Sequence, residues 1–287
     1  MTDVTAPTKS FAVLGHPIVH SLSPVMHNAA LRAMGLDAVY LAYDVLPDAL
    51  MGVLESMRAM GFGGVNLTIP HKEVAFAGLD QLDASAEAVG AVNTVVFTDA
   101  GICGHNTDGE GLMRAMQESF GETIEGRSVC VLGAGGAGRA AAITCALRGA
   151  ARVVVAGRRE EQVRPVVFDI AEAAPNCDVS SALGVEGTWA DASRAADLVV
   201  HTTSVGLNAD DAPVLGAEAF RSGQALFDMV YTTRETSLMR CAREAGAQAS
   251  NGLGMLLHQG AVALSIWTGR EAPVDVMREA LEDAMRS

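Results

Sequence analysis

The chain has 287 residues, which suits two domains, and its 49% hydrophobic content supports buried cores and excludes wholesale disorder. Its net charge of −14 argues against a protein that binds nucleic acid. Residues 1–10 lack the apolar core of a signal peptide, and no apolar run approaches the ~20 residues that cross a bilayer. We therefore expect a cytoplasmic protein without a membrane partner.

The first hundred residues predict a mixed α/β block. Ser23 followed by Pro24 is typical of a side-chain cap with proline at the first helical position. Asp99-Ala100-Gly101 lies between two apolar runs and predicts a hairpin turn. Strands are predicted at 11–14, 39–43, 64–68, 92–97 and 102–104, and helices at 23–34 and 48–60.

From Gly109 onward, helices alternate with continuous apolar runs, which are typical of parallel strands covered on both faces. This pattern predicts a doubly wound parallel sheet of the Rossmann type. Two helices follow at 253–269 and 274–285 with no further strand, and we expect them to return to the first block. Strands of the second block are predicted at 128–132, 152–156, 197–202 and 225–230.

A glycine-rich turn follows the first strand of the second block. Gly133, Gly135 and Gly138 form a GxGxxG pattern that opens a helix predicted at 137–147. Glycines allow the backbone to approach a pyrophosphate, whose charge then meets the free N–H groups of the helix N-terminus. A tight turn without a ligand is the alternative, but the strand before and the helix after favour dinucleotide binding.

The residues after the second strand of this block favour NADP. An NAD site usually has an acidic residue there, about 20 residues past the glycines, to accept from the ribose 2′-hydroxyl. This chain has Gly157, Arg158 and Arg159 instead, and a guanidinium can hold a 2′-phosphate through two parallel bonds. Arginines on a solvated surface are the alternative.

Polar side chains gather in the first block where its strands end. Such groups point into one crevice of an α/β layer and suit a small polyhydroxylated acid. Each one alone could equally be a turn or capping residue, so the prediction of a pocket rests on their co-occurrence. They are Ser21, Ser23, Asn66, Thr68, Asn93, Thr94, Asn106, Thr107 and Asp108.

Lys72 and Asp108 are the candidate reactive pair. Hydride addition to a carbonyl leaves an alkoxide that must be protonated, and the reverse reaction needs a base. A lysine beside a carboxylate can supply and retrieve that proton. His71 competes for this role, but a histidine between proline and lysine at a helix start is more typical of a cap or packing residue.

The sequence predicts no metal site. The five cysteines are scattered without CxxC spacing. His16 and His20 are four residues apart, but Pro17 argues against a continuous helix across them, and no HExxH motif is present.

Taken together, these motifs resemble the shikimate dehydrogenase family, over nearly the whole chain. The family reduces 3-dehydroshikimate to shikimate with NADPH in aromatic amino acid biosynthesis. The resemblance therefore implies an NADP-dependent oxidoreductase that acts on a CH–OH group of a small molecule. It rests on GHPIVHSLSPVMHN (15–28), GVNLTIPHK (64–72), GAVNTV (90–95), GHNTDGEGL (104–112), GAGGAGRA (133–140), TTSVGL (202–207), DMVY (228–231) and NGLGMLLHQGAVAL (251–264).

The resemblance also implies roles for individual residues. Lys72 and Asp108 would be the catalytic pair. The substrate would contact Ser21, Ser23, Asn66, Thr68, Asn93, Asp108, Tyr231 and Gln259. NADP would contact Gly133, Ala134, Gly135, Gly136, Ala137, Gly138, Arg158, Arg159, Thr202, Met229, Gly252 and Met255.

The resemblance implies a substrate-binding and catalytic domain (1–110 plus 253–287) and an NADP-binding domain (111–252) in a monomer or homodimer, with the active site in the cleft between them. The family's usual Asn-Arg-Thr is Gly157-Arg158-Arg159 in this chain, so an NAD-dependent quinate/shikimate dehydrogenase remains an alternative. A folate-linked dehydrogenase and a non-catalytic NADP(H)-binding regulatory protein are further alternatives.

Overall fold

The computed structural model describes residues 4–286 apart from 122, 185 and 209. The chain divides into two compact units. Unit 1 contains Met1–Gly111 and Leu256–Ser287, and unit 2 contains Leu112–Met255. The chain passes between the units inside two helices, α5 (Asp108–Phe120) and α10 (Leu253–Thr268), rather than through a linker.

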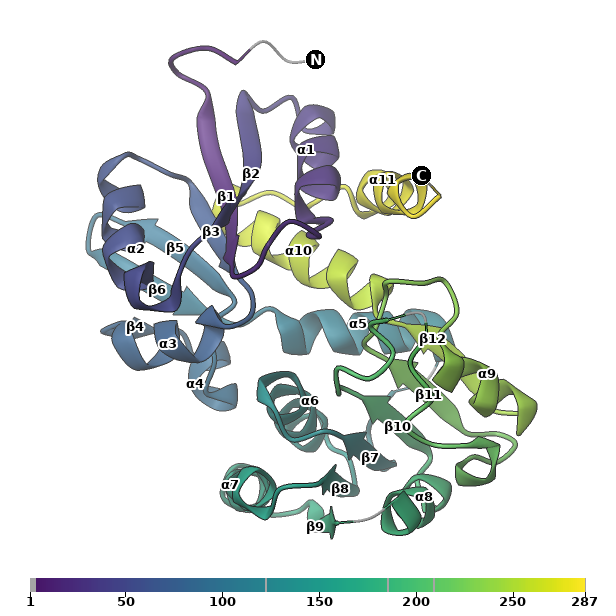
Figure 1. Cartoon of the computed structure of the whole chain (residues 1–287). Helices are drawn as coiled ribbons and strands as arrows, with labels where there is room; N and C mark the ends of the chain where they lie inside the picture. The colour runs from purple at the N-terminus through teal and green to yellow at the C-terminus, as the bar shows by residue number, and fades with distance from the viewer. Residues whose placement is uncertain (1–3, 122, 185, 209, 287) are drawn as a thin grey trace. The chain divides into compact units, whose positions relative to one another are not determined.

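Unit 1 is built on a six-stranded mixed sheet in the order β2-β1-β3-β5-β6-β4 (Figure 1). The hairpin predicted at Asp99–Gly101 is confirmed, because β5 and β6 are antiparallel with Thr98 opposite Gly101. The strands are β1 (Lys9–Gly15), β2 (Ala38–Asp44), β3 (Gly64–Leu67), β4 (Gln81–Leu82), β5 (Thr94–Thr98) and β6 (Gly101–His105). The helices are α1 (Ser23–Ala33), α2 (Leu50–Ala59), α3 (His71–Gly78), α4 (Ala84–Val89), α11 (Val274–Ala284) and the 3-10 turn Pro47–Ala49, with parts of α5 and α10.

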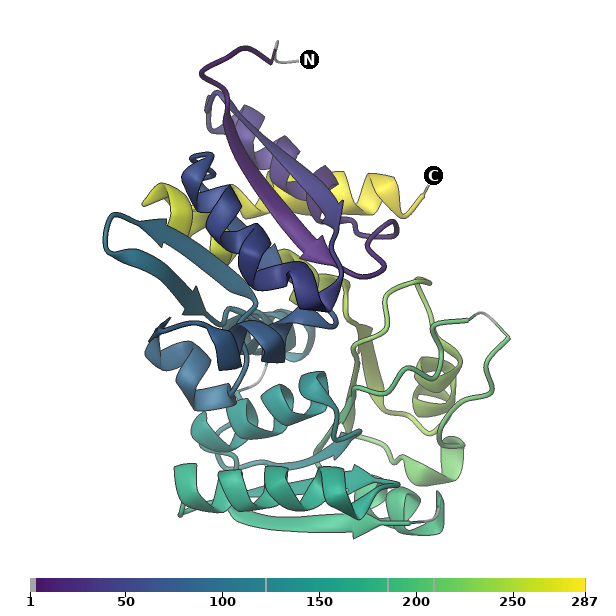
Figure 2. The same cartoon turned by 60° about the vertical axis from the view of Figure 1, so that its left-hand side comes forward.

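The two faces of this sheet carry different cores. Successive strand residues point to opposite faces of the sheet. On one face, Leu14 packs with Leu54 and Val65 beneath α2 and α3. On the other face, Phe11 stacks on Trp267 of α10. Figure 1 and Figure 2 show α1 and α11 on the side of the sheet opposite α2.

The Asn28 side chain joins α1 to β2 through hydrogen bonds. Its side-chain Nδ2 donates to the carbonyls of Pro24 and Tyr40, both at 2.8 Å, and its Oδ1 accepts from the Tyr40 backbone N–H at 2.9 Å. The residues at the start of α1 therefore have a fixed place beside β2.

The predicted Ser23 cap is wrong. Leu22 occupies the N-cap position of α1 without a side-chain cap bond, and Ser23 is the first, buried residue of the helix. The Ser23 backbone N–H donates instead to Ser21 Oγ at 3.3 Å. The Ser23 hydroxyl interacts with the Tyr40 phenol and acts to lower its pKa, against the larger effect of burial.

Unit 2 contains a six-stranded sheet in the order β12-β11-β10-β7-β8-β9, with every neighbouring pair parallel. This is the predicted doubly wound sheet. The strands are β7 (Ser128–Leu132), β8 (Arg152–Gly157), β9 (Asp178–Leu183), β10 (Leu198–His201), β11 (Ala225–Asp228) and β12 (Gln248–Asn251). The helices are α6 (Gly136–Leu147), α7 (Glu160–Ala173), α8 (Glu186–Ala195), α9 (Ser237–Glu244) and the 3-10 turn Ala217–Ala219, with parts of α5 and α10.

Helices α8 and α9 pack on one face of the unit 2 sheet, where Trp189 and Met239 join a core around Leu132. Helices α6 and α7 contact each other, and α7 lies against β8 and β9. In the described part of the chain, no helix combines the length and apolarity needed to cross a membrane.

His27 is a buried, neutral histidine in unit 1. Its ring stacks on Tyr40 with centroids 4.1 Å apart, and neither ring nitrogen has a hydrogen-bond partner among the described residues. Burial lowers the pKa of His27 from 6.5 to about 3. Below pH 6.5, the unfolded chain takes up a proton that the folded chain does not. This histidine therefore makes the free energy of unfolding fall as the pH drops from 6.5 towards 3, and it has no such effect above 6.5.

We predict that His27→Leu flattens this pH dependence. Between pH 7.5 and 5, the free energy of unfolding of unit 1 should fall by ~2 kcal/mol more in the unsubstituted chain than in the variant. Urea titrations in a Trp189→Phe background can measure this, because the remaining tryptophan, Trp267, lies 5.9 Å from the His27 ring. The control is His20→Leu, which removes an exposed histidine. Parallel pH profiles for His27→Leu and the parent would contradict the prediction.

Candidate active site

The start of α5 places Asp108 in a buried polar network of unit 1. Asn106 Oδ1 accepts from the Asp108 backbone N–H at 3.0 Å, and Asn106 Nδ2 donates to the Ala91 carbonyl at 3.0 Å. Asparagine side chains satisfy the free N–H groups at a helix start in this way. Asp108, a residue that is only 8% exposed, is therefore held at the first position of the helix.

Lys72 and Asp108 meet in the structure. Lys72 Nζ lies 2.6 Å from Asp108 Oδ2, and Asn93 Nδ2 donates to Asp108 Oδ1 at 2.9 Å. The Lys72 side chain is 30% exposed and the Asp108 side chain 11%. An ammonium carries three N–H donors, so the group retains donors for a further acceptor.

Asn93 bonds to this pair and Asn66 bonds to Asn93, and the amides of both asparagines are largely used within the protein. Asn66 Nδ2 donates to Thr94 Oγ1 at 3.0 Å and to the Asn93 carbonyl at 3.2 Å. Asn93 Oδ1 accepts from the Thr107 backbone N–H at 2.8 Å. A ligand hydroxyl at these amides would therefore share groups that already have partners.

Tyr40 is a member of this network that the sequence reasoning missed. Its hydroxyl donates to Asn66 Oδ1 at 2.7 Å, and this bond sets which way the Asn66 amide faces. Burial raises the pKa of Tyr40 well above its usual value, although the interaction with Ser23 opposes the shift, so the phenol keeps its proton. A tyrosine inside an apolar strand carries no sequence signal that separates it from the core.

The remaining predicted substrate residues lie in both units. In unit 1, Gln259 of α10 accepts from Asn93 Nδ2 at 3.3 Å, Ser21 contacts Ser23, and Thr68 directly follows β3. Tyr231 is in unit 2, where burial raises the pKa of its phenol.

His71 is a packing residue. It is fully buried, and its ring nitrogens have no hydrogen-bond partner among the residues that the structure describes. Burial lowers its pKa, while the backbone at Val45 and Gly15 partly offsets that shift. This environment favours the neutral ring.

The three glycines of the turn after β7 meet different constraints. Gly133 has φ +114°, and a Cβ there would lie 2.6 Å from Thr202 Oγ1. A Cβ at Gly138 would lie 2.0 Å from the Gly133 carbonyl oxygen, so this glycine allows α6 to approach β7. Gly135 is exposed, has nothing within 4 Å of the Cβ position and has a φ of −75°.

The protein itself does not require a glycine at position 135. A glycine there keeps the backbone N–H groups at the start of α6 open to a close-lying phosphate. Ala134, Gly136 and Ala137 complete this turn. Its shape therefore fits a dinucleotide pyrophosphate.

The other predicted NADP residues also lie in unit 2. Thr202 Oγ1 donates to the Leu132 carbonyl at 2.9 Å, next to the glycine turn. A Cβ on Gly252 would lie 2.2 Å from the Met229 carbonyl oxygen, so this glycine allows β12 and the chain after β11 to approach closely. Met255 lies in α10.

Arg158 and Arg159 follow β8 on the surface and have no ion-pair partner in the part of the chain that the structure describes. By contrast, Arg139 pairs with Asp169, and Arg164 lies 3.7 Å from Glu160. The two guanidinium groups after β8 therefore keep their donors for an anion.

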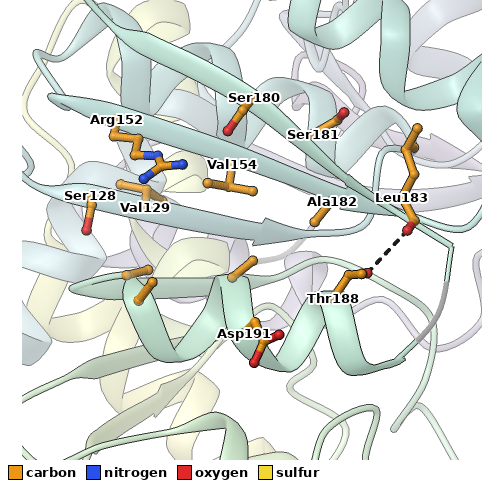
Figure 3. A pocket seen from close by; sticks show the side chains of 13 residues that line it. Ser128, Val129, Arg152, Val154, Ser180, Ser181, Ala182, Leu183, Thr188 and Asp191 are labelled. Atoms are coloured by element: carbon orange, nitrogen blue, oxygen red, sulfur yellow. Dashed lines mark hydrogen bonds between the residues drawn. The ribbon is translucent and has the colours of Figure 1, made fainter.

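A separate groove of about 360 Å³ lies between the unit 2 sheet and α8 (Figure 3). It extends from Ser128 and Arg152, the first residues of β7 and β8, to Thr188, which donates to the Leu183 carbonyl at 3.2 Å. None of the predicted site residues lines it. No group of three or more His, Cys, Asp or Glu residues within the described ranges could hold a metal ion.

Comparison with known proteins identifies the class. Residues 13–95 match the shikimate dehydrogenase substrate binding domain, and residues 252–282 match the shikimate 5'-dehydrogenase C-terminal domain. The shikimate dehydrogenase (NADP(+)) of Moorella thermoacetica is 44% identical over 99% of this chain and 96% of that protein.

Solved structures agree. The chain resembles shikimate 5-dehydrogenase from Listeria monocytogenes, in complex with shikimate and NAD, with a TM-score of 0.90 and 37% identity over 97% of this chain and 98% of that one. It also resembles shikimate 5-dehydrogenase from Thermus thermophilus, in complex with NADP(H) and shikimate, with a TM-score of 0.85 and 38% identity over 96% and 99% of the two chains. The chain belongs to the shikimate dehydrogenase family.

Proposed function

We propose that this chain catalyses the reversible NADPH-dependent reduction of 3-dehydroshikimate to shikimate, a step of aromatic amino acid biosynthesis. The observation that supports this most directly is the 2.6 Å contact between Lys72 and Asp108 inside a network of amides and hydroxyls. Membership of the family supports the substrate. We further propose that the chain acts in the cytoplasm on free small molecules, as a monomer or homodimer.

In this proposal, Lys72 manages the proton. NADPH, when bound, supplies a hydride to C3 of the substrate. The carbonyl oxygen then gains negative charge, and the Lys72 ammonium, oriented by Asp108, donates a proton to it. In the reverse direction, the neutral amine accepts the hydroxyl proton, so each direction balances one hydride and one proton.

In unit 1, Ser21 and Ser23 would bind the substrate carboxylate, while Asn66, Thr68, Asn93 and Gln259 would contact ring hydroxyls. Asp108 would do so as well, and Tyr231 of unit 2 would line the substrate side. The bond from Tyr40 to Asn66 supports this assignment, because it presents the amide in one orientation.

Lys72→Ala and Asp108→Asn should each lower kcat by ~10²- to 10⁴-fold, since both remove the positioned proton donor or its orienting group. The measurement is the initial rate of shikimate oxidation, followed by NADPH absorbance. Lys9→Ala is the matched control, because Lys9 is the chain's other lysine and is exposed at the start of β1. Near-normal turnover in both site variants would refute the assignment.

Arg158 and Arg159 should decide the choice between NADP and NAD. Replacing both with alanine removes the guanidinium groups proposed for the 2′-phosphate and should lower kcat/KM for NADP by ~10- to 100-fold. The value for NAD should change little. Arg164→Ala is the control, because this arginine already lies beside Glu160.

An NAD-dependent quinate/shikimate dehydrogenase is the second candidate. Gly157-Arg158-Arg159 departs from the family's usual sequence, and the similar Listeria monocytogenes structure is a complex with NAD. Initial rates with shikimate or quinate, each with NADP or NAD, separate the two candidates. The first candidate requires the highest kcat/KM for shikimate with NADP.

A further inference from the structure

Unit 2 contains a buried histidine–aspartate pair to which the proposed chemistry assigns no role. His201 and Asp228 are the last residues of β10 and β11 and lie opposite each other in the register of these strands. His201 Nδ1 lies 2.8 Å from Asp228 Oδ1, and both side chains are 1% exposed. Burying two such groups is costly unless their hydrogen bonds are satisfied.

Backbone N–H groups donate to both side chains that contact His201. The Val205 N–H donates to Thr203 Oγ1 at 3.2 Å, and Thr203 Oγ1 lies 2.6 Å from His201 Nε2. The Val230 N–H donates to Asp228 Oδ1 at 3.1 Å. With Asp228 as a carboxylate, His201 donates from Nδ1, and in the neutral ring Nε2 then accepts from the Thr203 hydroxyl.

The series of hydrogen bonds continues to α9. Thr236 Oγ1 donates to Asp228 Oδ2 at 2.6 Å and accepts from the Met239 N–H at 3.1 Å, as the N-cap of that helix. Every polar side-chain atom in this series of hydrogen bonds thus has a partner. The arrangement ties the segment after β10 to the segment after β11 and to α9.

Thr203 connects this series of hydrogen bonds to the glycine turn. A Cβ built on Gly133 would lie 3.2 Å from Thr203 Cγ2 and 3.3 Å from the Thr203 backbone nitrogen. Thr203 therefore packs directly beside the first glycine of the turn, with Thr202 on the same glycine. The Thr203 hydroxyl bond to His201 fixes the rotamer that presents this methyl group.

We propose that His201 and Asp228 are positioning residues for the cofactor: through the Thr203 hydroxyl, they hold the segment 202–207 against the glycine turn in the geometry that binds NADP(H). This inference rests on the proposed function, because it assigns the turn to NADP(H). It predicts that the loss of the His201–Thr203 bond weakens cofactor binding without altering the substrate site in unit 1.

The main test compares Thr203→Val with Thr203→Ser. Valine keeps the shape but removes the hydroxyl, so the Kd for NADPH and the KM for NADP should rise about 3- to 10-fold. The KM for shikimate and kcat should stay within about twofold. Serine keeps the hydroxyl and should restore most of the binding. NADPH fluorescence measures the Kd without requiring turnover.

A double-mutant cycle with His201→Asn tests the bond itself. Asparagine can still donate to Asp228 from a position close to that of Nδ1, but its side chain is too short to reach Thr203. The Thr203→Val/His201→Asn double variant should therefore bind NADPH about as weakly as either single variant, rather than with the product of the two losses. Thermal unfolding reports any general loss of stability separately.

The outcomes are distinguishable. Unchanged NADPH affinity in Thr203→Val, or effects that multiply in the cycle, would overturn the inference. An equal fall in activity with all ligands, at unchanged KM and Kd, would show a merely structural role and would also overturn it. If the unsubstituted chain binds NADPH but does not oxidise shikimate, the proposed function fails while the binding test still decides the role of His201. If it does not bind NADPH, both proposals fail.

Discussion

The contact between Lys72 and Asp108 requires hydrogen-bond partners for a buried carboxylate, and the polar residues of unit 1 supply them. The Asp108 side chain is only 11% exposed, so its carboxylate is stable only if both oxygens have partners, and those partners are Lys72 on Oδ2 and Asn93 on Oδ1. Asn93 must in turn face the right way, and the Thr107 N–H fixes its Oδ1. The pair therefore depends on backbone groups that the sheet and α5 hold rigidly.

Unit 2 also contains a buried carboxylate, Asp228, whose oxygens have hydrogen-bond partners. His201 and Asp228 are buried at the carboxyl ends of their strands, and backbone N–H groups donate to Asp228 and to the Thr203 hydroxyl beside His201. In both units, a buried carboxylate accepts from a basic side chain and from a second donor. Asp108 accepts from Lys72 and Asn93, and Asp228 accepts from His201 and the Val230 N–H. Removal of one partner would leave an unsatisfied buried group, so these networks constrain the local backbone more strongly than an apolar contact of the same size would.

The central strands and the site motifs could be predicted from the sequence, but the edges of the sheets could not. Strands such as β7 and β10 are buried on both faces and read as continuous apolar runs. The strands β9 (DVSSAL) and β12 (QASN) were missed because they lie at the two ends of the unit 2 sheet, where exposed positions leave room for polar residues. Tyr40 was missed for the opposite reason, since its neighbours in the strand are apolar. His201 was missed because a histidine at the end of an apolar strand does not show that Asp228 lies opposite it.

The glycine turn shows how a motif can combine information about fold and function. Gly133 and Gly138 are required by the protein alone, because a side chain at either position would collide with Thr202 or with the Gly133 carbonyl. Gly135 has ordinary backbone geometry and open space around it, so packing gives no reason for a glycine there, whereas a closely bound phosphate would give one. Two of the three glycines would therefore be expected in any tight turn of this shape, and the middle one is the glycine that dinucleotide binding, rather than packing, explains.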